Sequence, residues 1–318
     1  MDGRLPLYLS VETTSVCNAR CIFCAYPDMK RPKQIMTPEA FEDVIEQYVA
    51  MGGGSVNLTP IVGDPLIDPH FHQRLEVLGR YPQITEVVFF TNAIELKADK
   101  IKAIIECGNW LRTTISIAGT TRETYADLMG VDKFDRVRAN TLSFLETNLA
   151  NGNPHPIGVV FRSPHGPETL AKDPSPFLHE VNAYAEKGAC QIFFHEEMDT
   201  WSGDIPAERL TSRGFVIRKP THRSAPCALL YYMPTVLADG RVNACACRDV
   251  EATLIIGDVK SESLEAIWNG QALREIRDAH WRGDFPDVCQ TCDAYVPLDE
   301  KLADEPGPRG NWARLPET

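Results

Sequence analysis

The segment Cys17-Asn18-Ala19-Arg20-Cys21-Ile22-Phe23-Cys24 places three cysteines in a CX3CX2C arrangement shortly after a strand-like run at residues 8–12. That run predicts a buried strand, and a loop at the carboxyl end of a barrel's first strand is where catalytic groups gather. Three thiolates can ligate three irons of a [4Fe–4S] cube, which leaves the fourth iron open to a substrate or cofactor. A structural zinc site with a fourth ligand from elsewhere is the alternative, although zinc sites usually repeat a pair of cysteines.

Short strand-like runs and helix-like stretches alternate through the first two-thirds of the chain. The strand-like runs cover residues 8–12, 55–59, 86–91, 113–117, 157–161 and 191–194, and most are rich in β-branched or aromatic residues. The helix-like stretches begin at Thr37-Pro38-Glu39 and cover residues 98–107, 134–149 and 176–187. Six such βα units predict an α/β fold over residues 1–205, a partial (β/α)6 barrel that is open on one side.

The pattern changes near residues 201–226, a polar stretch that we interpret as a linker. Beyond it, Asp239-Gly240 between two apolar runs predicts a hairpin, and residues 264–277 predict a helix. We therefore expect a small C-terminal domain over residues 206–297. Residues 298–318 are rich in proline and charge, and they predict a loosely held tail.

Composition narrows the possible classes of protein. The 318 residues carry a net charge of -12, and their Lys and Arg residues are scattered, which disfavours nucleic acid as a partner. No apolar run reaches the roughly 18–20 residues of a membrane span, and no signal peptide is evident, so we expect a cytoplasmic protein. An acidic surface would suit a cationic substrate, although a general role in solubility is the simpler explanation.

A second group of cysteines lies in the last third of the chain. In a reducing compartment, clustered cysteines usually indicate a metal site or catalysis. Cys245 ends a GX4C pattern 18 residues after Cys227, and Cys289 and Cys292 form a CX2C pair. Four thiolates would complete a [4Fe–4S] site without an open iron, and a structural zinc site is the alternative. Cys107 and Cys190 are expected in the core.

The first triplet resembles the signature of the radical S-adenosylmethionine (SAM) superfamily, including the aromatic Phe23 before its last cysteine. Gly63-Asp64 follows the second predicted strand, where that family has a Gly-Gly-Glu type motif. Thr91-Asn92-Ala93 ends the third strand, where the family often has Thr-Asn-Gly. Ser116 and Arg162 lie on or just after the fourth and fifth strands.

This resemblance implies a SAM site and a mechanism. It places Phe23 near the adenine, Gly63 and the shorter Asp64 at the SAM amino group, Asn92 in the same site, and Ser116 and Arg162 at the ribose or carboxylate. SAM would chelate the open iron held by the triplet, and one electron, from a donor such as flavodoxin or ferredoxin, would cleave it. The resulting 5'-deoxyadenosyl radical abstracts hydrogen from an unactivated carbon, while the protein supplies positioning and excludes water.

The second cysteine group resembles the twitch domain, a shortened form of the SPASM domain. The resemblance rests on residues 256–259, residues 267–269 and the terminal CX2C pair, and it implies one auxiliary [4Fe–4S] cluster. The region is similar to radical SAM enzymes of aminoglycoside biosynthesis, among them a dehydrogenase of butirosin biosynthesis and an epimerase of neomycin biosynthesis.

Cys247 separates the reactions that these relatives suggest. It lies two residues after Cys245, so on an extended segment both thiols face the same way. Cys247 is a candidate hydrogen-atom donor, as in the resembling epimerase, but it is also a candidate cluster ligand in place of Cys245, or a bland small residue. We expect an epimerase acting on an aminoglycoside or amino sugar, that is, a small and cationic substrate.

The alternatives are a dehydrogenase acting on a similar alcohol and, less favoured, a peptide-modifying maturase. His195-Glu196-Glu197 after the sixth strand are candidates for substrate contact, with a solvated loop as the alternative. Trp201 is a candidate floor of a sugar site, with interdomain packing as the alternative, and Arg248 and Asp249 are candidate contacts to substrate hydroxyls or amines.

Overall fold

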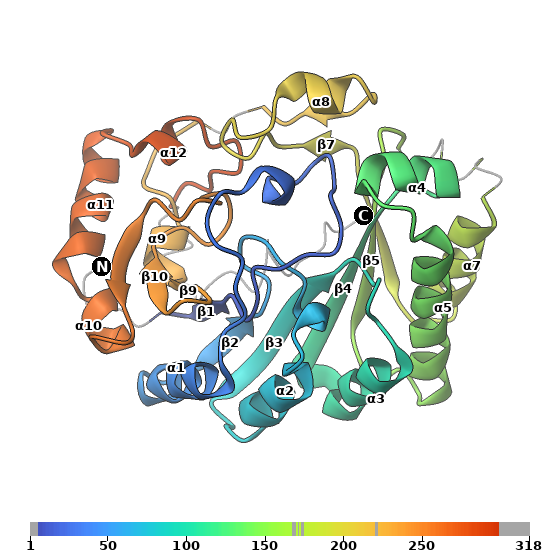
Figure 1. Ribbon diagram of the computed structural model, residues 1–318, viewed down its shortest axis with the longest axis horizontal. Helices are drawn as coiled ribbons and strands as arrows, with labels where there is room; N and C mark the ends of the chain where they lie inside the picture. The colour runs from blue at the N-terminus through green and yellow to red at the C-terminus, as the bar shows by residue number, and fades with distance from the viewer. Residues whose placement is uncertain (1–5, 167–169, 171, 173–174, 220–221, 299–318) are drawn as a thin grey trace.

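The computed structural model describes residues 6–298, apart from residues 167–169, 171, 173–174 and 220–221 (Figure 1). The predicted tail therefore lies outside the described residues, except for Leu298. Within the described residues, no helix combines the length and the apolar character that crossing a membrane requires.

A single nine-stranded sheet, in the order β11-β10-β9-β1-β2-β3-β4-β5-β6, forms the centre of the molecule. The barrel part of the sheet consists of the parallel strands β1 (Tyr8–Val11), β2 (Gly54–Asn57), β3 (Ile84–Thr91), β4 (Leu111–Ala118), β5 (Ile157–Arg162) and β6 (Gln191–His195). All six strands match the predicted runs to within two residues at each end. Among the strands of the described residues, β6 does not pair with the other edge of the sheet, and the predicted α/β fold with a partial barrel is confirmed.

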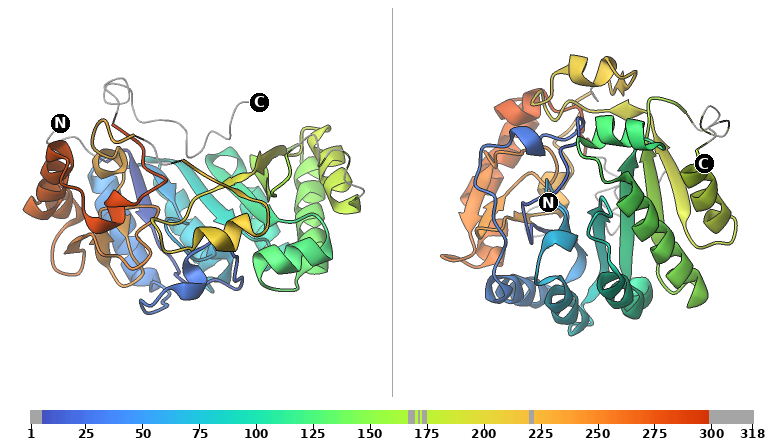
Figure 2. Two further views of the ribbon diagram at one scale, coloured as in Figure 1. Left: turned by 90° about the horizontal axis from the view of Figure 1, so that it is seen from above. Right: turned by 45° about the vertical axis from the view of Figure 1, so that its right-hand side comes forward.

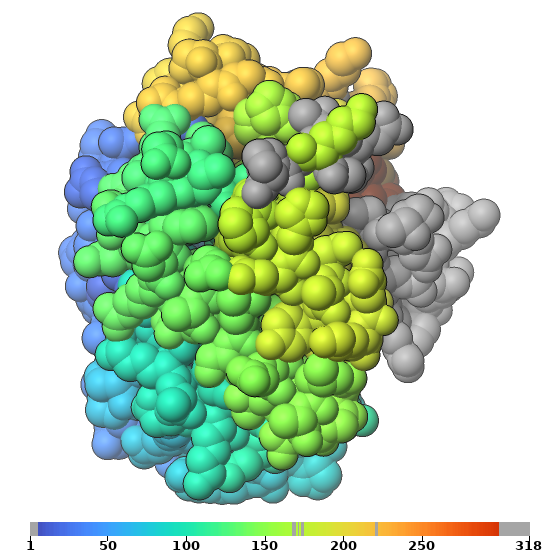
Figure 3. Space-filling view, turned by 90° about the vertical axis from the view of Figure 1, so that its right-hand side faces the viewer, coloured from blue at the N-terminus to red at the C-terminus, as the bar shows by residue number. Residues whose placement is uncertain are grey.

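Among the described residues, the helices that follow the parallel strands cover the outer face of the sheet, apart from Arg122–Met129, which lies at the carboxyl-terminal end of the strands (Figures 1 and 2). They are α1 (Pro38–Ala50), α2 (Phe71–Gly79), α3 (Ala98–Cys107), α4 (Arg122–Met129), α5 (Phe134–Ala150) and α7 (Pro176–Ala185). The Thr37 hydroxyl accepts from the Ala40 backbone N–H at 3.2 Å, so the predicted cap of α1 is confirmed. Seen from the side, the residues of α5 and α7 form a continuous layer (Figure 3).

The sequence predicts a C-terminal domain of its own, whereas the structure joins that unit to the barrel sheet. Strand β9 (Thr235–Val236) pairs in parallel with β1, and β10 (Arg241–Asn243) and β11 (Ile255–Asp258) continue the sheet in antiparallel fashion. The hairpin between β9 and β10 turns at Gly240, whose φ of 93° lies in the region that favours glycine.

The single helix predicted over residues 264–277 is wrong. The structure has α10 (Leu264–Trp268) and α11 (Gln271–Arg282), separated at Gly270. Gly270 has an extended backbone and acts as the N-cap of α11, so the first helix ends before it. Between the barrel and β9 lie the paired strands β7 (Glu197–Met198) and β8 (Val216–Ile217), with α8 (Ala207–Thr211) between them.

Further short elements are α9 (Leu229–Tyr232), α12 (Asp287–Gln290) and the 3-10 helices η1 (Tyr26–Asp28), η2 (Pro65–Ile67) and η3 (Gly108–Trp110). The linker predicted near residues 201–226 therefore contains regular structure. Cys190 is buried and Cys107 is half-buried, and the Cys107 thiol donates to the Ala103 carbonyl at 3.2 Å.

Candidate active site

The loop after β1 carries Cys17, Cys21 and Cys24, and it is hydrogen-bonded to the end of α4. The backbone N–H groups of Arg20 and Ile22 donate to the carbonyls of Met129 and Leu128, each at 3.0 Å. These bonds use carbonyls at the end of α4 that have no partner within the helix. The Cys21 sulfur lies 3.7 Å from the Met129 sulfur. The helix therefore fixes the loop on which the three thiols lie.

A buried ion pair fixes the chain just beyond the triplet. The Arg31 guanidinium pairs with the Glu12 carboxylate, and their side chains are only 7% and 0% exposed. The Arg31 Nε donates to the Val250 carbonyl at 2.7 Å, and the Glu251 carboxylate accepts from the backbone N–H groups of Lys30 and Arg31. The loop is thus tied to the C-terminal unit as well as to the barrel.

The three thiols of the loop share an environment that disfavours bare thiolates. Burial raises the pKa of Cys17 to about 12 and that of Cys24 to about 11, and it raises the pKa of Cys21 well above its ordinary value. A thiol in such surroundings becomes a thiolate when a metal coordinates it. Three thiols on one short loop are the donor set that a [4Fe–4S] cluster with one open iron requires.

The Asp64 carboxylate already accepts hydrogen bonds from other groups of the chain. This buried side chain accepts from the Leu66 N–H at 3.0 Å, the Asn92 N–H at 2.9 Å and the Thr91 hydroxyl at 2.9 Å. Asp64 therefore ties the loop after β2 to the end of β3, and its predicted contact with the SAM amino group stays a prediction. Beside it, an added Cβ on Gly63 would lie 2.1 Å from the Thr14 carbonyl oxygen, so only glycine fits.

Four other predicted SAM residues lie beside the triplet. The Asn92 side-chain amide is 3.7 Å from the Cys17 sulfur. The Arg162 guanidinium lies 5.4 Å from the centre of the Phe23 ring, and its Nε donates to the Ser116 hydroxyl at 3.1 Å. The structure thus brings residues from β3, β4 and β5 to the first cysteine loop, although their contacts with SAM stay predictions.

His195 joins this group through Arg162. The Arg162 Nη1 lies 3.0 Å from the His195 Nδ1. Burial, followed by the charges of Arg162 and Arg218, lowers the pKa of His195 to about 4, so the ring is neutral near pH 7. Because Arg162 can only donate, Nδ1 is the acceptor and Nε2 carries the proton. His195 therefore offers a hydrogen-bond donor close to the predicted SAM site.

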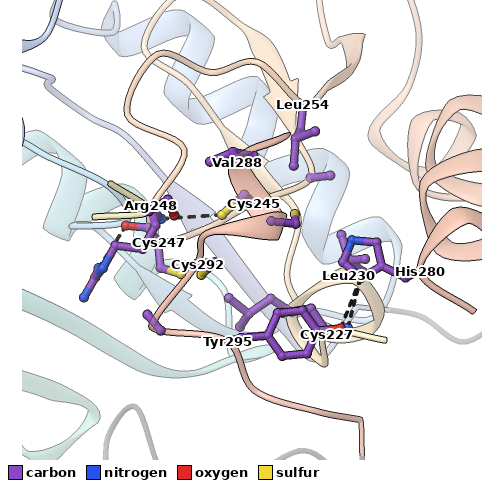
Figure 4. A pocket seen from close by; sticks show the side chains of 15 residues that line it. Cys227, Leu230, Cys245, Cys247, Arg248, Leu254, His280, Val288, Cys292 and Tyr295 are labelled. Carbon is purple, nitrogen blue, oxygen red and sulfur yellow. Dashed lines mark hydrogen bonds between the residues drawn. The ribbon is translucent and has the colours of Figure 1, made fainter. Parts of the chain in front are cut away.

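The second cysteine group lines one cavity in the C-terminal unit (Figure 4). The cavity is lined by Cys227, Cys245, Cys247, Cys289 and Cys292, together with Ser202, His280 and Tyr295 among others. Within the described part of the chain, no three His, Cys, Asp or Glu side chains converge on the position of a single metal ion. The thiols instead surround a shared space.

This donor set fits an auxiliary iron–sulfur cluster. Four or more thiols around one cavity supply the ligands that a fully coordinated [4Fe–4S] cluster needs. His280 is 3% exposed and lines the same cavity, and its Nε2 has no hydrogen-bond partner among the described residues. A buried polar atom of this kind is usually satisfied by a group outside the chain, such as water or a ligand.

Cys245 and Cys247 lie against each other within the cavity. The hydrogen bond between their side chains lowers the pKa of Cys245 to about 6 and raises that of Cys247. Burial raises the pKa of Cys227, Cys289 and Cys292, and the nearby thiol of Cys245 raises each further. Cys245 is thus close to the three other predicted ligands, and the predicted proximity of Cys247 to the same group is observed.

Residues 199–202, which we call the bridging turn, connect the two cysteine groups. The Trp201 indole N–H donates to the Phe23 carbonyl at 2.9 Å, next to Cys24. The Arg248 guanidinium lies 4.6 Å from the centre of the Trp201 ring and makes a bidentate pair with Asp199 at 2.7 and 2.6 Å. Trp201 therefore packs between the two sites, which agrees with the packing alternative for this residue.

The bridging turn is also strained and anchored. Trp201 and Ser202 have φ values of 54° and 58°, a left-handed backbone conformation that is uncommon for residues other than glycine. The Thr200 hydroxyl donates to the Asp293 carboxylate at 2.8 Å, directly after Cys292. No spacing rule relates Asp199 to Arg248 or Thr200 to Asp293, so sequence patterns did not indicate these pairs.

Comparison with known proteins agrees with both sites. Residues 11–159 match the model of the radical SAM superfamily, and residues 227–293 match that of an iron–sulfur cluster-binding domain. GTP 3',8-cyclase of Aquifex aeolicus (strain VF5) is 31% identical over 113 residues, 34% of each chain. That of Petrotoga mobilis (strain DSM 10674 / SJ95) is 26% identical over 161 residues, 50% of this chain and 48% of the relative. The chain thus matches a third to a half of the length of these relatives.

Solved structures share the fold over most of the chain. BtrN in complex with AdoMet and 2-DOIA has a TM-score of 0.60 at 16% identity, and the match covers 94% of this chain and 97% of BtrN. Native anSMEcpe with bound AdoMet has a TM-score of 0.56 at 16% identity, over 86% of this chain and 84% of that one. The two matched domains imply SAM, a [4Fe–4S] cluster and an auxiliary cluster as the cofactors.

Proposed function

We propose that this chain, a radical SAM protein with an auxiliary iron–sulfur cluster domain, epimerises one carbon of a carbohydrate-like small molecule, such as an aminoglycoside or amino sugar. When bound, SAM and the first cluster supply a 5'-deoxyadenosyl radical that removes a hydrogen atom from the substrate. The loop with Cys17, Cys21 and Cys24 would hold the first cluster. The cavity with Cys227, Cys245, Cys289 and Cys292 would hold the auxiliary one.

The position of Cys247 carries the proposal. Its thiol lines the auxiliary cavity against Cys245, and Cys245 is close to the three other predicted ligands, so Cys245 would suffice as the fourth ligand. Arg248, the next residue, contacts Trp201, which in turn reaches the Phe23 carbonyl in the first loop. Cys247 thus belongs to the segment of the C-terminal unit that faces the loop of Cys17, Cys21 and Cys24.

A thiol at this position can complete an inversion. An S–H bond is weaker than the C–H bond of a carbinol, so Cys247 would transfer a hydrogen atom to the substrate radical from the opposite face. Cys247 would then regain its hydrogen by taking up one electron and one proton, the electron from a small carrier such as flavodoxin or ferredoxin. With the electron that cleaves SAM, one turnover consumes two electrons and one proton, and the substrate is not oxidised.

The second candidate is a dehydrogenase that acts on a similar alcohol. The auxiliary cavity supports it, because four thiols would hold a cluster able to accept the second electron from the substrate radical. BtrN, which shares the fold, has been crystallised with AdoMet and 2-DOIA. In this reaction Cys247 would have no role as a donor.

Turnover in deuterated water with a panel of aminoglycosides and amino sugars distinguishes the two reactions. Because a thiol proton exchanges with water before transfer, the epimerised product should contain one deuterium at the inverted carbon. Cys247→Ala should still form 5'-deoxyadenosine and bind both clusters, but it should yield no inverted product. Cys107→Ala, a thiol in α3, is the matched control and should behave as the wild type. A ketone product, or full epimerase activity in Cys247→Ala, would overturn the proposal.

A further inference from the structure

Tyr125 on α4 has a buried hydroxyl without a hydrogen-bond partner. The side chain is fully buried, and its ring packs 5.8 Å from that of Phe134. Among the described residues, none accepts from or donates to the Tyr125 hydroxyl. An unsatisfied buried hydroxyl destabilises the folded chain, so its presence in a well-packed helix calls for a partner outside the chain.

The hydroxyl lies near the first cysteine loop. Tyr125 precedes Met129 by four residues, so the two side chains share one face of α4. On that face, Met129 contacts the Cys21 sulfur at 3.7 Å, and its carbonyl accepts from the loop backbone. Burial raises the pKa of the Tyr125 hydroxyl, and the nearby thiols of Cys21 and Cys17 raise it further. The face of α4 that supports the triplet thus carries an unused hydrogen-bond donor.

We propose that the Tyr125 hydroxyl donates a hydrogen bond to a sulfur of the [4Fe–4S] cluster held by Cys17, Cys21 and Cys24. A phenol in a neutral state has one proton to donate, and a cluster sulfur is an acceptor. Hydrogen bonds to the sulfurs of a cluster help to set its reduction potential, and they favour the reduced cluster because it carries more negative charge. Tyr125 would therefore ease the uptake of the electron needed to cleave SAM, whatever the substrate.

The substitution Tyr125→Phe removes the hydroxyl and keeps the ring. A redox titration of the holoenzyme can be followed by electron paramagnetic resonance. The signal that changes on addition of SAM identifies the first cluster, and the signal of the auxiliary cluster is the internal control. At a fixed potential, the ratio of reduced to oxidised first cluster should fall about three- to tenfold, which corresponds to the net contribution of one typical hydrogen bond. The auxiliary cluster should titrate as in the wild type.

A matched control is Tyr48→Phe on α1. Tyr48 is also fully buried, but its hydroxyl donates to the Ser55 carbonyl at 3.3 Å, so this variant should leave both titrations unchanged. Proton electron–nuclear double resonance in H2O and D2O adds a direct test, because one exchangeable proton coupled to the reduced first cluster should disappear in Tyr125→Phe. An unchanged titration, or an unchanged set of exchangeable protons, would overturn the proposal.

Discussion

The ion pair between Arg248 and Asp199 should stabilise the junction of the two cysteine groups, and Arg248→Ala measures by how much. The pair is bidentate, and its side chains are only 19% and 11% exposed. Removal of one partner from a fully buried pair costs about 3–5 kcal/mol, and the partial exposure reduces this to about 2–3 kcal/mol. Loss of the stacking on Trp201 adds about 0.5–1 kcal/mol. We therefore expect a loss of about 3 kcal/mol.

Urea unfolding of the cluster-free chain under reducing conditions is the assay, after circular dichroism has shown that the chain is folded. Arg248→Lys keeps the charge but loses the bidentate geometry, so it should fall between the wild type and Arg248→Ala. Arg122→Ala removes an arginine whose partners Asp132 and Asp135 are exposed, and it should leave the unfolding midpoint unchanged. A loss in Arg248→Ala no larger than that in Arg122→Ala would refute the reasoning.

The same pair gives a pH dependence. Although burial alone would raise it, the Arg248 guanidinium lowers the pKa of Asp199 below its ordinary value. A carboxyl group with a depressed pKa in the folded state adds stability above its unfolded pKa of about 4, and this stability is lost as the pH falls through the folded value. The difference in unfolding free energy between the wild type and Arg248→Ala should therefore be full at pH 7 and shrink below about pH 4.

Three further predictions concern the loops around the first site. Gly63→Ala forces a methyl group against the Thr14 carbonyl at a φ of 103°, and it should lower the unfolding free energy by at least about 2 kcal/mol; a wild-type urea midpoint would contradict this. Arg31→Ala leaves the Glu12 carboxylate buried without its partner, and it should cost about 3–5 kcal/mol in the same assay, whereas a loss below 1 kcal/mol would show that the pair is not buried in solution. Replacement of all three triplet cysteines by alanine should leave about half of the iron, by metal analysis, and abolish SAM cleavage, and retained cleavage would contradict the assigned ligands: Cys17, Cys21 and Cys24.

The parallel strands were predictable because most of them are short runs rich in β-branched or aromatic residues, which favour strands. Helix α3 was predicted at its observed bounds, whereas α2 and α4 were missed. His70 gives α2 no side-chain cap, and the capping box of α4 uses Thr124 where the recognisable pattern has Glu or Gln. Residues 264–277 were predicted as one helix because Gly270 alone did not reveal that it caps a second helix. Local signals are strong where one residue decides the backbone and weak where packing decides it.

The site residues were also predictable where the signal is local and not where it depends on tertiary packing. The CX3CX2C, GX4C and CX2C patterns predicted both groups of thiols, because these short patterns keep cluster ligands together along the chain. The hydrogen bonds from Thr91 and Asn92 to the Asp64 carboxylate were not predicted. The sequence identifies a carboxylate at a motif position, but it does not identify the donors that surround it in the fold. The bridging turn was not predicted either, because Trp201 and Phe23 are 178 residues apart and their contact depends on the tertiary fold.

Strand β1, which leads into the first cysteine loop, is paired along both of its edges. On one side it pairs with β2, and on the other the backbone N–H groups of Ser10 and Glu12 donate to the carbonyls of Pro234 and Val236 at 3.0 and 2.9 Å. A fragment truncated after residue 205 would leave this apolar strand as an open edge, which is a template for aggregation. The C-terminal unit therefore protects an edge of the barrel sheet from aggregation. The barrel and the C-terminal unit cannot be exchanged or separated without exposing that edge.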